Sequence, residues 1–218
     1  MNEKYKTSLK EKGWAEDKFD SIENLKEKLY QLSQSFGTPK SSRKSISAIQ
    51  EIKPTRSSSA RPNTLSKIYS DKAFPLHVDT AHWCLPSRFC IMTCLNPGSE
   101  NRETVLLDFK KVALSTAERN LLKNALFRVV NGKESFFSTI LSDDRSFIRY
   151  DTGCMIPLNE DSKRAVELMN FIQKNNNLIE LNWDIGKILI MDNWRILNGR
   201  NTAINSDNDR TLLRVLTI

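Results

Sequence analysis

The chain has 218 residues, of which 39% are hydrophobic and 27% are charged, a balance typical of a globular domain with one core. No apolar run approaches the roughly 18 residues of a membrane helix. The first residues, MNEKYKTSLKEKGW, lack the apolar stretch of a secretory signal. These features argue against a membrane-spanning or secreted protein and predict a cytoplasmic one, and they give no indication of the oligomeric state.

The net charge of +7 is concentrated in the first part of the chain. Residues 1–70 hold 14 Lys and Arg against 8 Asp and Glu, and the rest of the chain is nearly neutral. A basic segment can attract an anionic partner, but it is more often a solvated surface, so nucleic-acid binding is not expected. The cysteines form no C-x-x-C pair, which predicts free thiols and no zinc site. They are Cys84, Cys90, Cys94 and Cys154.

The N-terminal part of the chain predicts a tail, a helix and a loop, in that order. Residues 1–14 are expected to be a tail, and residues 15–36 predict an amphipathic helix that ends at the sequence Gly-Thr-Pro. Residues 40–66 are rich in Ser, Arg and Pro, which predicts a flexible loop or a lid, with a short strand at residues 46–52. The apolar positions with helical spacing are Phe19, Ile22, Leu25, Leu29 and Leu32.

From residue 74 onward, the pattern is that of short strands with two helices between them. A capping box from Ser115 to Glu118 begins a short helix that ends near residue 124, and residues 161–174 predict an amphipathic helix. Many short strands with few, peripheral helices indicate a mainly β (α+β) fold, either a sandwich or a double-sheet jelly roll. The strands are expected at residues 88–95, 104–109, 127–130, 135–140, 147–150, 178–183, 187–191 and 211–218.

The clearest chemical pattern is His77-Val78-Asp79. On an extended segment, residues two apart point to the same face, so the imidazole of His77 and the carboxylate of Asp79 can approach one point. Two histidines and one carboxylate form the facial triad that binds iron(II) and leaves positions open for oxygen and a co-substrate. The pattern alone is not specific, because any histidine near an aspartate supplies it.

A second pattern supplies the context. The segment DNWRILNGR at residues 192–200 resembles the distal motif of the taurine dioxygenase-like and clavaminate synthase-like iron(II)/2-oxoglutarate oxygenases, where a strand ends in a D-N-x-R-x-L-H-G-R run. The segment AFPLHVD at residues 73–79 is similar to the proximal motif of that family. The resemblance runs from about residue 20 to the C-terminus, and it implies one double-stranded β-helix (jelly-roll) domain over residues 1–218 with flanking helices.

The resemblance also implies iron(II) and 2-oxoglutarate as cofactors, and a small-molecule substrate that is hydroxylated or otherwise oxidised. His77 and Asp79 fall on two metal-ligand positions, but Asn198 falls where the family has its distal histidine. An amide oxygen is a weaker ligand for iron(II) than a neutral imidazole. Two interpretations therefore stay open, an active oxygenase and a non-catalytic relative that keeps the pocket as a binding module.

The remaining candidates are assigned by their place relative to the two motifs. Arg210 matches the family arginine that pairs with a carboxylate of 2-oxoglutarate, and Thr104 matches a hydroxyl for the same co-substrate. Arg214 is expected on the same face of the last strand, where it would bind the substrate or the other carboxylate. Substrate contacts are also assigned to Arg149 and His82, with a solvated or packing role as the alternative. Asn193, Trp194 and Arg195 are expected to fix the strand and its turn.

Overall fold

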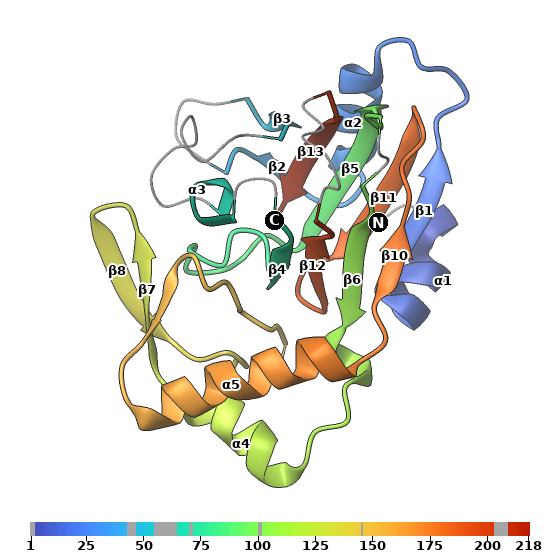
Figure 1. Cartoon of the computed structure of the whole chain (residues 1–218). Helices are drawn as coiled ribbons and strands as arrows, with labels where there is room; N and C mark the ends of the chain where they lie inside the picture. The colour runs from blue at the N-terminus through green and yellow to red at the C-terminus, as the bar shows by residue number, and fades with distance from the viewer. Residues whose placement is uncertain are drawn as a thin grey trace.

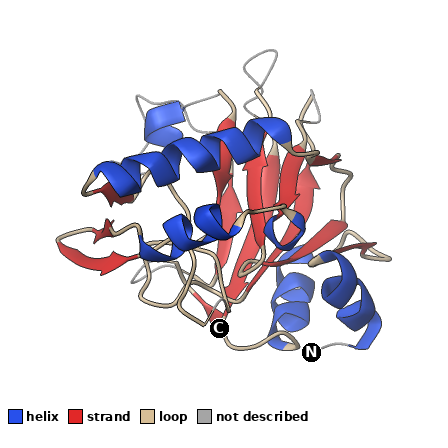
Figure 2. Cartoon of the chain, turned by 90° about the horizontal axis from the view of Figure 1, so that it is seen from below, coloured by secondary structure: helices blue, strands red, loops and turns tan. Residues whose placement is uncertain are grey.

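The computed structural model describes residues 3–42, 47–54, 65–69, 72–99, 102–144, 146–202 and 209–218. Within these stretches, the chain forms three antiparallel sheets with helices on their outer sides (Figure 1). Figure 2 shows helices on both sides of the strands. The structure is thus mainly sheet with some helices, as the sequence predicts. No helix in the described stretches is both long and apolar enough to cross a membrane.

The largest sheet has six strands in the order β1-β11-β5-β13-β2, with β3 also pairing with β13. Its strands are β1 (Trp14–Lys18), β2 (Pro39–Lys40), β3 (Ile49–Ile52), β5 (Phe89–Asn96), β11 (Lys187–Asp192) and β13 (Thr211–Thr217). Helices α1 (Glu3–Lys12) and α2 (Leu25–Gln34) cover one face. Because β5 is buried on both faces, it is apolar along nearly its whole length instead of alternating.

A second, four-stranded sheet packs against the other face of β5. Its order is β10 (Ile179–Leu181), β6 (Thr104–Asp108), β12 (Ile196–Arg200) and β4 (Phe74–His77). Side chains from both sheets form one buried cluster between them, in which Cys90 and Met92 of β5 lie with Leu106 of β6. Two facing sheets with an apolar layer between them make the frame that carries the candidate site.

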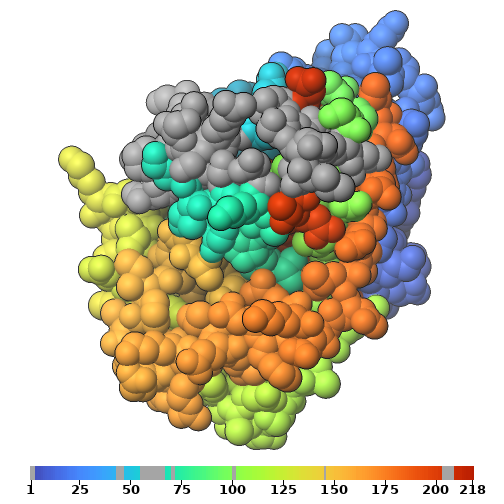
Figure 3. Space-filling view, in the orientation of Figure 1, coloured from blue at the N-terminus to red at the C-terminus, as the bar shows by residue number. Residues whose placement is uncertain are grey.

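Part of the remaining described chain covers the outer face of the second sheet. A three-stranded sheet has the order β8 (Glu134–Ser138), β7 (Phe127–Asn131) and β9 (Met155–Pro157). The helical segments are α3 (Leu65–Tyr69), η1 (Phe109–Lys111), α4 (Thr116–Asn124) and α5 (Glu160–Asn175). Met169 and Ile172 of α5 pack with Val105 and Leu197 of the second sheet, and α5 crosses the lower front of the molecule in Figure 3.

Most of the predicted elements after residue 74 are confirmed. Ser115 Oγ accepts a hydrogen bond from Glu118 N at 3.2 Å and Glu118 Oε2 accepts one from Ser115 N at 2.8 Å, so the capping box begins α4. Some differences remain. The strand expected at residues 147–150 is only an isolated bridge between Leu141 and Ile148, and the one at 178–183 is shorter. The strands β4, β9 and β12 were not among the expected ones.

The expected N-terminal tail is wrong, and the helix expected over residues 15–36 is confirmed only from Leu25 onward. Most of the expected tail is α1, which buries Tyr5 and Leu9, and the expected helix over residues 15–36 begins only at Leu25. Residues 14–18 are instead the edge strand β1, paired with β11, and Ile22 is 61% exposed. The local apolar spacing mimics a helix, but pairing with a distant strand determines the conformation.

The expected loop over residues 40–66 is described only in part. Residues 43–46 and 55–64 lie outside the described stretches, so a lid there stays a prediction. The short strand expected at residues 46–52 is found as β3, which pairs with β13. α3, which begins at Leu65, was not expected.

Gly13 directly follows α1 and has a φ of +80°. Its amide donates a hydrogen bond to Leu9 O, and its carbonyl accepts one from Asp192 N. A Cβ there would lie 2.8 Å from Ile196 Cδ1, whereas one on Gly132 (φ +64°) would meet nothing within 4 Å. We expect Gly132→Ala to cost about 1 kcal/mol of unfolding free energy for its positive φ. Gly13→Ala should cost about 1–3 kcal/mol more because of the overlap. Chemical denaturation of both variants measures the difference, and equal losses would contradict it.

Candidate functional site

A cavity of about 110 Å³ is lined by side chains from both large sheets. The second sheet contributes His77, Thr104 and Asn198, and the first contributes Arg214. Arg210, which directly precedes β13, also lines it, so both arginines face the same cavity, as their spacing of four residues predicts. Residues that lie far apart in the sequence therefore meet in one place.

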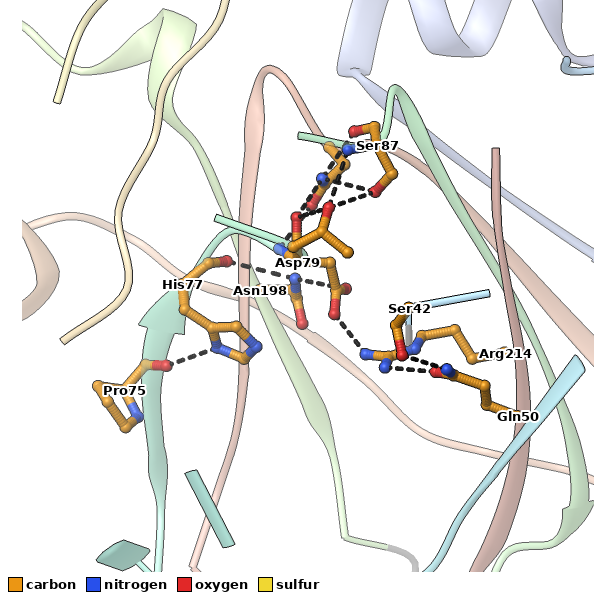
Figure 4. A network of polar contacts seen from close by, with 10 residues as sticks. Ser42, Gln50, Pro75, His77, Asp79, Ser87, Asn198 and Arg214 are labelled. Carbon is orange, nitrogen blue, oxygen red and sulfur yellow. Dashed lines mark hydrogen bonds and ion pairs between the residues drawn. The ribbon is translucent and has the colours of Figure 1, made fainter. Parts of the chain in front are cut away.

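His77 and Asn198 lie directly opposite each other in the β4–β12 ladder. Figure 4 shows the His77 ring, the Asp79 carboxylate and the Asn198 amide close together. Asn198 Nδ2 lies 3.4 Å from Asp79 Oδ2 and 3.3 Å from His77 O. Nδ1 of His77 is 3.0 Å from Pro75 O. A carbonyl only accepts, so Nδ1 carries the proton and Nε2 keeps the lone pair that a metal requires.

Asp79 is fixed through its backbone by Asn193. Its amide donates to Asn193 Oδ1 at 2.9 Å, and Asn193 Nδ2 donates to Asp79 O at 3.0 Å and to Ser87 O at 2.8 Å. Asn193 is only 1% exposed, so this arrangement is shielded from water. The expected role of Asn193 in fixing the chain is therefore observed, and it extends to the loop that carries Asp79.

The buried carboxylate of Asp79 forms an ion pair with the half-buried guanidinium of Arg214. Arg214 Nη2 also donates to Gln50 Oε1 at 2.7 Å, and Gln50 Nε2 donates to Ser42 Oγ (Figure 4). Burial alone would raise the pKa of Asp79, but the charge of Arg214 and the hydrogen bonds from Cys90 and Asn198 hold it below its ordinary value. Asp79 is therefore a buried carboxylate that is ionised at neutral pH.

Arg210 and Thr104 form the other end of the cavity. Arg210 Nη2 donates to Thr104 Oγ1 at 3.3 Å, and the indole Nε1 of Trp183 donates to the same oxygen at 2.9 Å. All three side chains are buried. A hydroxyl and a guanidinium held side by side can bind a carboxylate, the first as a single donor and the second as a fork.

Arg149 and His82 do not line this cavity. Arg149 is 1% exposed and donates to the carbonyls of Ala81, of Trp83 at 2.5 Å and of Cys84 at 2.8 Å. Burial lowers the pKa of Arg149 to about 10, so it is still a cation at neutral pH. The structure gives it a structural contact in place of the expected substrate contact, because both of its terminal nitrogens donate to the loop that follows Asp79.

His82 lies in the wall of a separate, wider cavity of about 1050 Å³. Its ring stands edge-on to Trp83, with the centroids 6.3 Å apart. Lys40 and Lys133 line the same cavity. His82 does not line the cavity at His77, so it is placed neither to act as a further metal ligand there nor to make the expected substrate contact in that cavity.

The donors fit two positions of an iron(II) site and leave the third weak. Within the described stretches, no group of three His, Cys, Asp or Glu side chains could hold a metal ion. Asn198 turns its amide nitrogen toward Asp79, and a half-turn of the amide would present the oxygen instead. Cys90 contacts the Asp79 carboxylate, but burial raises the pKa of its thiol well above the ordinary value, so it stays neutral.

Sequence reasoning missed Gln50, Ser42 and Trp183. Gln50 lies opposite Arg214 in the β3–β13 ladder, and Trp183 reaches Thr104 from beyond β10. None of these residues belongs to a sequence motif, and the arrangement of the strands brings them to the site. The one available signal was the short strand expected around residues 46–52.

No protein-family model and no curated protein sequence matches the chain. Solved structures do match. The non-heme iron oxygenase OrfP in complex with Fe and alpha-ketoglutaric acid has a TM-score of 0.76 at 17% identity, over 98% of this chain and 77% of that chain. Asparagine oxygenase in complex with Fe(II), 2S,3S-3-hydroxyasparagine and succinate has a TM-score of 0.76 at 16% identity, over 99% and 77%. At these identities, the likeness shows a shared fold.

Arg149→Met should destabilise the protein, because a buried guanidinium is removed and three carbonyls of the loop that follows Asp79 lose their donor. We expect a loss of about 2–4 kcal/mol in unfolding free energy. Arg128→Met, on the exposed face of β7, is the matched control and should change stability by less than about 0.5 kcal/mol. Denaturant titration of both variants makes the comparison. An Arg149→Met protein as stable as the control would show that the guanidinium does not support the loop.

Proposed function

We propose that the chain is an iron(II)/2-oxoglutarate-dependent oxygenase that acts on a small amino-acid-like substrate. One observation carries the proposal, namely that His77 and the ionised Asp79 meet Arg210 and Thr104 in a single cavity. The shared fold supports it, and so do the relatives, which are described with hydroxylated arginine or asparagine bound. We propose further that the two facing sheets form a double-stranded β-helix within a single domain.

His77 Nε2 and the Asp79 carboxylate would hold iron(II), with Asn198 or water at the third position. The co-substrate carboxylate would pair with Arg210, and Thr104 would donate to it. Iron(II) and 2-oxoglutarate, when bound, would supply the activation of dioxygen, in which O2 is the oxidant, 2-oxoglutarate is converted to succinate and CO2, and the second oxygen atom hydroxylates a C–H bond of the substrate. The chain's own contribution is to orient these groups and to exclude water from a buried site.

Arg214 is proposed to neutralise Asp79 and to bind an anionic group of the substrate. Its Nη1 contacts Asp79 while Nη2 contacts Gln50, so the guanidinium is already oriented at the edge of the cavity. An α-carboxylate is the chemistry that such a fork recognises. This role does not extend to Arg149, whose donors are used by the backbone.

A non-catalytic binding module is the second candidate, and Asn198 is the observation that favours it. The Asp79–Arg214 ion pair adds to it, because Arg214 can compensate the buried carboxylate without a metal. The two candidates differ in whether iron(II) binds when 2-oxoglutarate is present.

Anaerobic titration of the apoprotein with iron(II), with and without 2-oxoglutarate, tests the proposal. The visible absorption of the metal chelate and calorimetry report binding. We expect wild type to bind both together, and Arg210→Ala to weaken 2-oxoglutarate by the equivalent of about 2–5 kcal/mol, because a buried carboxylate loses its partner. Equal 2-oxoglutarate binding in both proteins would refute the role of Arg210. No iron binding in wild type would favour the binding module.

Asn198→His should tighten iron(II) binding at least about tenfold, since imidazole is a better ligand than an amide and even partners outside a metal's ligand set are worth this much. The histidine would stand opposite His77, at the wall of the cavity. Asn131→His, on the exposed β7–β8 hairpin, controls for the mere addition of a histidine. Unchanged, already tight binding in Asn198→His would mean that the metal has another third ligand.

A further inference from the structure

A second hollow, of about 580 Å³, shares no lining residue with the cavity at His77. It lies where α1, η1, α4 and the turn between β11 and β12 meet, and we call it the basic groove. We propose that the basic groove binds an acidic peptide segment that carries one apolar side chain. This inference does not rest on the proposed function, because none of its residues belongs to the candidate site.

The rim of the basic groove is strongly cationic. Six basic side chains line it against a single carboxylate, Asp192. Arg88 is in an ion pair with Asp192 at 2.8 Å, and Arg195 is in one with Asp108 at 2.6 Å. The others are Lys6, Lys10, Lys110 and Arg119.

Three of these cations have no counter-charge in the described stretches. Lys6 pairs with Glu3 at 3.1 Å, but no ion pair of Lys10, Lys110 or Arg119 occurs there. A solvated face usually intersperses both signs of charge. Like charges around a hollow with an apolar wall instead focus the field into it and attract an anion.

The floor of the basic groove is apolar. Phe109, Val112, Leu141 and Ile148 lie there, and each is at most 8% exposed, so the floor is the surface of the core itself. Phe147 lines it as well. A fitting ligand therefore has an apolar group in the middle and carboxylates around it, which is the chemistry of an acidic peptide with one large aliphatic residue.

A nucleic acid fits this surface less well. Unpaired bases stack on open aromatic faces, but the Trp194 ring has the Arg88 guanidinium over it at 4.5 Å and Phe147 against it at 5.6 Å. The indole is also held by its hydrogen bond to Pro86 O at 2.9 Å. The cations surround one hollow and do not follow a stripe along which a phosphate backbone could run.

The test uses fluorescence anisotropy with a labelled twelve-residue glutamate peptide that has one central leucine. We expect the whole chain to bind it at low salt, more weakly as salt rises. Lys10→Glu/Lys110→Glu reverses two exposed charges from separate elements and should weaken binding at least tenfold. Lys133→Glu/Lys174→Glu makes the same change in net charge outside the groove and should change binding less than twofold.

A second probe, in which glutamine replaces the leucine, tests the floor and should bind several-fold more weakly. No binding of the first peptide, or equal losses in the two double variants, would overturn the proposal. So would an oligonucleotide of equal charge that binds more tightly than the peptide and loses affinity only in Lys10→Glu/Lys110→Glu. Because the four lysines are exposed, matching unfolding curves should verify that the variants fold.

Discussion

The hydrogen bonds of Asn193 are the constraint on which the candidate site depends. They join the turn between β11 and β12 to the loop after β4, so that the strand carrying Asn198 and the residue Asp79 are held by one buried amide. β12 then pairs with β4 and sets Asn198 opposite His77. A site made from two distant segments is rigid only if something couples them, and a side-chain amide that both donates and accepts can do so.

The elements that the sequence predicted well are those whose signal is local. Strand β5 is a continuous apolar run, and the Ser115–Glu118 capping box is complete within four residues. The two motifs also indicated that His77, Asp79, Arg210 and Arg214 belong together, and the structure does bring these residues to one cavity. Whether they bind iron and 2-oxoglutarate stays a proposal.

The parts of the fold and of the site that the sequence did not predict depend on pairing between distant strands. Such pairing leaves no local pattern in the sequence. Residues 14–18 form an edge strand because they pair with β11, whereas their own apolar spacing indicates a helix. Gln50 becomes part of the site only because β3 pairs with β13 in the register that sets it opposite Arg214. The role of Arg149 was missed for the same reason, since the carbonyls that it binds belong to a loop more than sixty residues away.

If iron(II) binds as proposed, the presence of asparagine instead of histidine at position 198 would have a specific electrostatic consequence. A neutral imidazole and a neutral amide carry the same charge, so Asn198 would lower the donor strength of the site but leave its charge balance unchanged. The ionised Asp79 would still attract a divalent cation, in competition with Arg214. A chelating dianion offers two oxygens to the metal and a carboxylate to Arg210, and it can therefore replace part of the lost donor strength. On this argument, metal and co-substrate would bind as a pair, each weak alone.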